Sequence, residues 1–216
     1  TANPKSVQLS MNIIASVYKD DDGKIWIGTW GKGLNIYDPR TNTISYYNTH
    51  SPAGFQINED HVHSILKCSN GLIFLGTRQG ITVYDPVQKR FTDLAVYYPT
   101  VEFPKFKDNR IYKLIEDSRN NIWIATQSGL YVFNLVTLET RSYFKTDGLA
   151  DNSIIELMQD DLNKIWIGTA NGLTIYDPDN KEHPFTTTRR NENTLSTKKG
   201  NDTYSTLSNN YINAIV

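Results

Sequence analysis

The protein is a chain of 216 residues with a formal net charge of -1, and 38% of its residues are hydrophobic. A chain of this length can bury a sizeable core, while its balanced charge disfavours the basic surface that sequence-independent nucleic-acid binding needs. No run of 18 apolar residues predicts a membrane-spanning helix. The single cysteine, Cys68, excludes an internal disulfide framework.

A short motif recurs four times along the chain. Each copy places an aromatic residue between aliphatic ones and ends in a small residue and a threonine, as in residues 25–29 (Ile-Trp-Ile-Gly-Thr). The aromatic anchors, spaced by 48, 49 and 43 residues, are Trp26, Phe74, Trp123 and Trp166. A period of about 40–50 residues is typical of β-propeller blades.

Each repeat predicts four short strands in the same order. Apolar residues eight, nine and twelve positions before the anchor predict a first strand, and the anchor lies on the second. A glycine followed by leucine or isoleucine opens the third strand, and a fourth, weaker strand follows. The turn before the anchor carries residues that tolerate positive φ, namely Gly23, Gly71, Asn120 and Asn163.

We therefore expect an all-β fold of β-propeller blades: four four-stranded antiparallel blades plus the first strand of a fifth, as a fragment of a larger propeller. Either the four blades close on themselves or another copy covers the open ends, and in view of the second option we expect self-association. The blades are predicted at residues 9–47, 57–94, 106–144 and 149–187, with a polar loop at 188–208 and the first strand of a truncated fifth blade at 209–216.

The motif order Asn-x-Ile-x-x-Ile-x-x-Asp, Ile-Trp-Ile-Gly-Thr and Gly-Leu-x-x-Tyr-Asp-Pro resembles the two-component regulator propeller repeat, over about residues 9–216. Departures are Phe74 for Trp, Cys68 for Asp, Ala125 for Gly, and Asn134-Leu135 for Asp-Pro. The resemblance implies the periplasmic sensor region of a hybrid two-component histidine kinase, with oligosaccharides or other glycan-derived ligands. It also implies that kinase and DNA-binding activities and the membrane anchor belong to other parts of a parent protein, so no nucleic acid is expected to bind here.

Residues that vary at a fixed address of the repeat are the candidate ligand contacts. In a propeller, the loop entering the first strand and the loop between the second and third strands share one face. Aromatic rings with Arg, Asn and Gln match the chemistry that binds sugars, although an ordinary polar surface is the alternative for each residue. The candidates are Trp30, Lys32, His61, His63, Arg78, Gln79, Arg110, Tyr112, Gln127 and Asn171.

His61 and His63 lie two residues apart on a predicted strand, so both should face the same way. With His50 they could hold a metal, but no cysteine or carboxylate completes a recognised spacing, so we expect a hydrogen-bonded or channel-lining pair and no metal. No catalytic motif and no cofactor motif is found, and the chain is not expected to be an enzyme. A dimerisation module with the ligand bound elsewhere, and a propeller lyase, are the alternative functions.

Two further features carry expectations about local structure. The aspartate six residues before an anchor should bond turn amides, and Cys68, which replaces it once, is expected to be an inert thiol. The aromatic connection at residues 95–108 either contacts a partner or ligand, or folds back on its own blade.

Overall fold

A computed structural model describes residues 7–103 and 110–189 of the chain. The chain divides into two compact units, residues 1–116 and residues 117–216. The predicted first strand of a fifth blade at 209–216 lies outside the described residues, as does nearly all of the predicted polar loop at 188–208.

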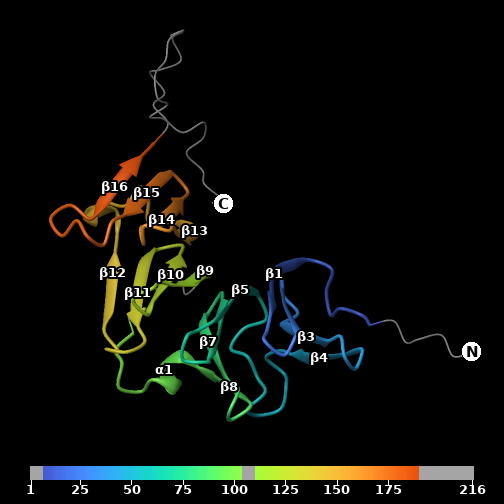
Figure 1. Cartoon of the computed structure of the whole chain (residues 1–216). Helices are drawn as coiled ribbons and strands as arrows, with labels where there is room; N and C mark the ends of the chain where they lie inside the picture. Colours follow the sequence, from blue (N-terminus) through green and yellow to red (C-terminus); the bar gives the residue numbers. More distant parts are fainter. Residues whose placement is uncertain (1–6, 104–109, 190–216) are drawn as a thin grey trace, which may run out of the picture. The chain divides into compact units, whose positions relative to one another are not determined.

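The described residues form sixteen strands in four four-stranded antiparallel sheets, so the predicted all-β fold of propeller blades is confirmed (Figure 1). The sheet orders are β1-β2-β3-β4, β5-β6-β7-β8, β12-β11-β10-β9 and β13-β14-β15-β16. The strands of the first unit are β1 (Ile14–Lys19), β2 (Ile25–Thr29), β3 (Leu34–Asp38), β4 (Thr43–Tyr47), β5 (Val62–Lys67), β6 (Ile73–Thr77), β7 (Gly80–Asp85), β8 (Arg90–Asp93) and β9 (Ile111–Glu116).

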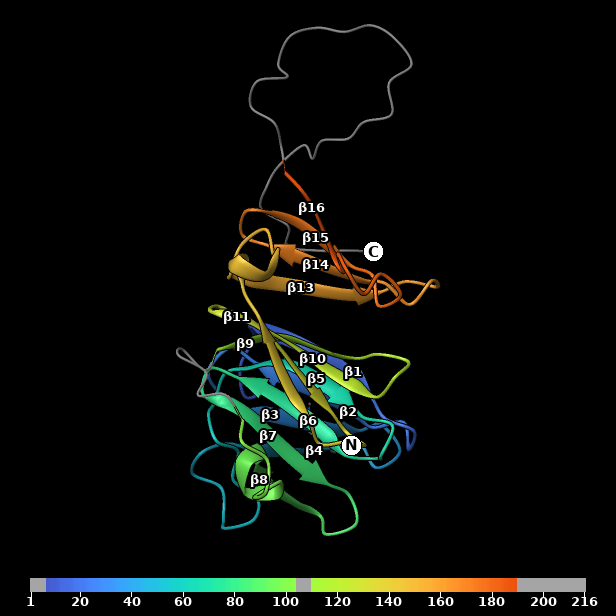
Figure 2. The ribbon, with the colours of Figure 1, turned by 90° about the vertical axis from the view of Figure 1, so that its left-hand side faces the viewer.

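The second unit continues the same alternation of short strands and tight turns. In the last sheet, consecutive strands lie next to one another (Figure 2). Its strands are β10 (Asn121–Thr126), β11 (Gly129–Asn134), β12 (Thr140–Tyr143), β13 (Ile154–Gln159), β14 (Ile165–Thr169), β15 (Gly172–Tyr176) and β16 (Phe185–Thr188).

The turn before each anchor strand adopts the predicted left-handed backbone. Its φ values are +81° at Gly23, +88° at Gly71, +61° at Asn120 and +62° at Asn163. Glycine and asparagine are the residues that reach this region at least cost, which explains their recurrence at one address.

Three of the four anchor residues are buried in the core. Trp26 is 3% exposed and packs in a cluster with Leu34, Val62 and Leu75, which come from two neighbouring sheets of the first unit. Phe74 and Trp123 are also buried, whereas Trp166 is half-buried. The packing of the anchor ring between two sheets is what joins successive blades.

A small residue two positions after the anchor permits this packing. A Cβ atom placed on Gly76 would lie 2.8 Å from Cγ2 of Ile111, on the strand β9 that packs against β6. One on Gly28 would collide with the carbonyl oxygen of Val62. Neighbouring strands therefore approach closely at Gly28 and Gly76, which leaves no room for a larger side chain.

The connection after β8 departs from the prediction. The fourth strand was expected to reach Leu94, but it ends at Asp93, whose side chain accepts a hydrogen bond from the Ala95 amide and starts a short helix, α1 (Leu94–Tyr97). Helix α1 packs on β7 and β8, and the Tyr97 hydroxyl donates to Asp85 Oδ2 over 3.1 Å. The described part of this aromatic connection thus folds back on its own blade.

Candidate functional site

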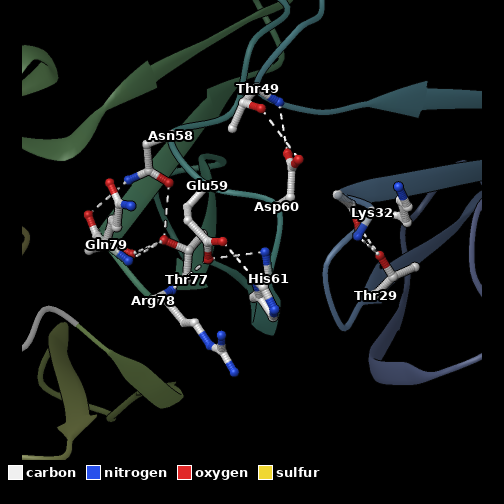
Figure 3. Close-up of polar contacts among 12 residues, drawn as sticks. Thr29, Lys32, Thr49, Asn58, Glu59, Asp60, His61, Thr77, Arg78 and Gln79 are labelled. Atoms are coloured by element: carbon white, nitrogen blue, oxygen red, sulfur yellow. Dashed lines mark hydrogen bonds and ion pairs between the residues drawn. The ribbon is translucent and has the colours of Figure 1, made fainter.

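The hairpin loops between second and third strands are closed by the threonine that ends each motif. Thr29 Oγ1 donates to the carbonyl oxygen of Gly33 over 2.8 Å, and Thr77 Oγ1 donates to that of Gly80 over 2.9 Å. The same hydroxyls accept from the amides of Lys32 and Gln79. The loops after β2 and β6 are therefore fixed by bonds between a threonine hydroxyl and the main chain (Figure 3).

A β-bulge places His63 at the entrance of β5. Val62 faces Thr77 and Ser64 faces Gly76, so His63 is the extra residue between two paired positions. The same irregularity occurs at the starts of β1 and β13. Because a bulge leaves one residue unpaired and redirects its side chain, it supplies a variable position at the same end of these three sheets.

Six of the predicted contacts meet in the first unit, in what we call the Trp30 cluster. It consists of Trp30 after β2, His61 and His63 at the start of β5, Arg78 after β6, and Arg110 and Tyr112 at the start of β9. The ring centroid of His63 lies 4.6 Å from that of Trp30 and 6.2 Å from that of Tyr112. The sequence thus predicted correctly that loops of the two addresses converge.

The two histidines lie on the same side, as expected. Their ring centroids are 6.3 Å apart in a stacked arrangement, and His61 forms an isolated bridge with Trp30. The regular strand alternation that suggested this does not hold at this point, because the bulge at His63 interrupts it. Backbone pairing with Trp30 and the bulge together set the positions of the two rings.

Glu59 organises the cluster, and sequence reasoning did not single it out. Its Oε1 lies 2.6 Å from Nδ1 of His61, while its Oε2 accepts from the main-chain amides of His61 at 3.0 Å and Arg78 at 3.2 Å (Figure 3). One carboxylate therefore ties the entry of β5 to the loop after β6. The only signal in the sequence is an acidic residue two positions before a histidine, which alone is not specific.

His63 is buried next to positive charge. The residue is 9% exposed, and its Nε2 atom has no hydrogen-bond partner among the described residues. Burial, with the nearby charges of Arg78 and His61, lowers the pKa of His63 to about 4. The imidazole is therefore neutral at neutral pH.

Arg78 lies against the exposed indole. Its guanidinium carbon is 5.5 Å from the centroid of the Trp30 ring, a cation–π contact, and Trp30 itself is 42% exposed. The buried Nε atom of Arg78 has no partner among the described residues, and Figure 3 shows its guanidinium directed away from Glu59 and Gln79. Nearby, Arg110 Nη1 donates to the Tyr112 hydroxyl over 3.3 Å.

The remaining candidates are not drawn into this cluster by any described side-chain contact. Lys32 and Gln79 are exposed, and they are fixed through their main chains. Gln127 and Asn171 belong to the second unit, where they follow β10 and β14 and are exposed. Arg189 Nε donates to the carbonyl oxygen of Asn171 over 3.1 Å.

The structure also bears on metal, membrane and thiol chemistry. The described residues contain no group of three His, Cys, Asp or Glu side chains that could hold a metal, and His50 pairs with Thr49. Within residues 7–103 and 110–189, no helix has the length and apolar character needed to cross a membrane. Burial raises the pKa of the Cys68 thiol, which disfavours the reactive thiolate.

Two grooves lie beside the anchors, at the opposite end of the strands from the hairpin loops. One of about 700 Å³ in the first unit is lined by Trp26, Tyr47 and Tyr84, among others. One of about 290 Å³ in the second unit is lined at the equivalent addresses by Trp123, Tyr143 and Tyr176. Because the same scaffold positions line both, these grooves follow from the repeat, and the Trp30 cluster is the better candidate for a specific site.

The register, turns and anchors define the chain as a β-propeller repeat protein. The model of the family described as two component regulator propeller matches residues 8–31, 105–128 and 148–171. Three segments of the chain therefore match the repeat of this family, in agreement with the resemblance found in the sequence.

A curated relative and two solved structures are similar to the chain. Histidine kinase P4 of Formosa agariphila is 31% identical in an alignment of 183 positions that covers 63% of this chain and 13% of that protein. The extracellular domain of BT4673 from B. thetaiotaomicron, named as a one component system, has a TM-score of 0.72 at 21% identity, over 95% of this chain and 25% of that chain. The extracellular domain of BT3049 from B. thetaiotaomicron, named as a hybrid two component system, has a TM-score of 0.69 at 20% identity. That match covers 100% of this chain and 32% of the other. The chain therefore spans a minor part of each, and at these identities the structures show the shared fold.

Proposed function

We propose that this chain is part of the periplasmic ligand-sensing propeller of a hybrid two-component sensor histidine kinase. The repeat family, the similarity to a histidine kinase and the fold shared with extracellular domains of such systems support this proposal. The kinase chemistry and the membrane anchor would then belong to other parts of a longer protein.

The ligand in this proposal is a glycan-derived sugar that contacts the Trp30 cluster. The observation that carries it is a half-exposed indole flanked by two buried polar atoms that have no partner among the described residues, Nε of Arg78 and Nε2 of His63. Aromatic faces stack on the C–H surface of sugars, and polar groups beside them bond hydroxyls or acidic substituents. Buried polar atoms in proteins normally have hydrogen-bond partners, so two unpartnered ones beside an exposed indole favour a ligand site over an ordinary polar surface.

Signalling requires the ligand to favour one arrangement of the sensor over another. We propose that ligand contact with the hairpin loops changes how propellers associate, so self-association of the chain is part of this proposal. Sedimentation velocity of the chain with and without a bound sugar measures this directly. An unchanged sedimentation coefficient at saturating ligand would remove association from the signalling step.

Isothermal titration of the 216-residue chain against a panel of oligosaccharides tests the binding claim. We expect at least one sugar to release or absorb heat, and we expect Trp30→Ala to weaken that binding at least tenfold. If no sugar binds the chain, or if binding survives Trp30→Ala unchanged, the chain is a structural or dimerisation module as far as this face is concerned. Turnover of a sugar that His63→Asn abolishes would instead indicate a propeller lyase.

A further inference from the structure

In the described part of the chain, the Trp30 cluster contains more hydrogen-bond donors than acceptors. Glu59 is the carboxylate that the described contacts place there, and both of its oxygens are engaged by His61 and by the amide of Arg78. The Nε atom of Arg78 always carries a proton, is buried and has no acceptor among the described residues. A buried donor without an acceptor is costly, so a ligand that supplies one gains affinity.

The charges of the cluster point in the same direction. The guanidinium groups of Arg78 and Arg110 both act on His63, where the carboxylate of Glu59 opposes them and is itself held by His61. His63 is neutral at neutral pH, so its ring carries a single N–H and adds no positive charge. Among the described residues, an anionic group is therefore the complement that this site lacks.

We propose that the sugar bound at the Trp30 cluster carries a carboxylate, which Arg78 and His63 bind while the indole of Trp30 contacts the sugar ring. This inference rests on the proposed function and specifies its ligand as an acidic sugar of the uronic-acid class. A carboxylate is planar and has two oxygens, which fits the fork of a guanidinium and the two nitrogens left unpaired among the described residues. A sulfate ester is tetrahedral, so only two of its three free oxygens can lie in the plane of that fork.

The layout of the cluster matches such a ligand. Arg78 lies 5.5 Å from the Trp30 ring centroid, and the His63 ring centroid lies 4.6 Å from it, so both side chains flank one aromatic surface. In a uronic acid the carboxylate is attached directly to the ring that would contact the indole. The charged and apolar parts of the ligand thus meet adjacent parts of one site.

The experiment uses the 216-residue chain and pairs of sugars that differ only in charge. Short oligosaccharides of galacturonate, glucuronate and mannuronate are each titrated beside their carboxyl-reduced counterparts, and sulfated disaccharides form a third arm. We expect at least one carboxylated sugar to bind roughly ten times or more tightly than its reduced counterpart, and more tightly than the sulfated sugars. Raising the salt concentration should narrow that difference.

Variants assign the preference to the cluster. Arg78→Gln should bring the carboxylated sugar down to the affinity of the reduced one, and Arg78→Lys, which keeps the charge but loses the fork, should give an intermediate value. Trp30→Ala should lower the affinity of the chain for both the carboxylated and the reduced sugar of a pair. Arg141→Gln, which removes an exposed guanidinium in the second unit, is the matched control and should leave both affinities within twofold.

The outcomes separate this inference from the proposed function. If reduced or sulfated sugars bind as tightly as carboxylated ones in a Trp30-dependent way, the carboxylate proposal is overturned and the sensing proposal stands. If no sugar of any arm binds to the folded chain, both proposals fail. Thermal unfolding of each variant followed by circular dichroism confirms that lost binding does not reflect lost folding.

Discussion

The indole Nε1 of Trp123 donates a 2.7 Å hydrogen bond to Oδ2 of Asp117, six residues earlier in the chain. The other carboxylate oxygen accepts from the Asn121 amide over 2.9 Å, inside the turn before the anchor strand. Trp26 with Asp20 and Trp166 with Asp160 repeat the arrangement at 2.8 Å. One carboxylate therefore fixes both the turn and the ring that holds two blades together.

The second repeat replaces both partners of this pair. Phe74 has no N–H group to satisfy, and Cys68 stands where the acceptor would be. The turn still forms through main-chain bonds, with Cys68 N donating to Leu72 O over 2.8 Å and Gly71 N donating to Cys68 O over 2.9 Å. The two departures from the repeat are thus one coupled change, since removing both partners leaves no buried donor unpaired.

This coupling predicts a non-additive pair of substitutions. Asp117→Ala should lower the free energy of unfolding by about 1–3 kcal/mol, because it leaves the buried indole N–H without an acceptor. Adding Trp123→Phe should cost less than the sum of the two single changes, with a coupling energy of about 1 kcal/mol or more. Urea unfolding of the four variants of the cycle measures it, and strictly additive values would contradict the account.

Strands β6 and β9 pack so closely at Gly76 that one added methyl group should disturb their packing. Gly76→Ala should lower stability by about 1–3 kcal/mol, because the new Cβ would lie 2.8 Å from Cγ2 of Ile111. In combination with Ile111→Ala, which removes that atom, the alanine at 76 should cost less than it does alone. If Gly76→Ala is neutral in thermal unfolding, the sheets do not approach as described.

His63 predicts a pH dependence with a defined sign. Its folded pKa of about 4 lies below the unfolded value of about 6.5, so between these values the unfolded chain binds more protons. The shifted pKa of His63 therefore adds its full share to the free energy of unfolding above about pH 6.5, and this share is lost as the pH falls toward 4. His63→Phe should flatten the loss of stability over this window. NMR titration of the His63 ring should give a midpoint near 4, and Arg78→Gln should raise it; a midpoint near 6.5 would refute the buried position.

The first strands of different blades should differ in how well they tolerate a charged residue at the same repeat position. Val17 is 65% exposed, whereas Leu114 and Leu157 at the same address of later repeats are each 2% exposed. Val17→Lys should leave thermal stability nearly unchanged, while Leu114→Lys and Leu157→Lys should prevent folding, since they bury an unpaired charge. If Val17→Lys also disperses an oligomer in sedimentation, this face takes part in the proposed self-association.

The sheets and turns could be predicted from the sequence because the same residue pattern recurs four times, so each strand and turn is indicated by several copies. The four positive-φ turns were predicted from that recurrence and are confirmed, and close packing at the small residue is found at Gly28 and Gly76. The bond from the indole N–H to the carboxylate was not foreseen, although its spacing of six residues is constant in the three repeats that contain both partners.

The candidate site was predicted in part, for a physical reason. Addresses in the repeat brought Trp30, His63 and Arg78 to one place, because loops at one end of adjacent strands must converge. The role of Glu59 was missed, since it lies before β5 in an irregular segment whose contacts depend on the fold. The bulge at His63 also has no sequence signature, because it reflects backbone pairing rather than residue type.

Sugar binding at the Trp30 cluster can be tested most directly by NMR. The experiment follows the four tryptophan indole N–H signals of the chain during titration with an oligosaccharide that binds it. Three of the indoles are bonded to Asp20, Asp117 and Asp160, while Trp30 lies in the proposed site. We predict that the Trp30 signal shifts in a saturable manner and that the three anchor signals stay within the linewidth. A Trp30 signal that remains unmoved at saturation would contradict the account.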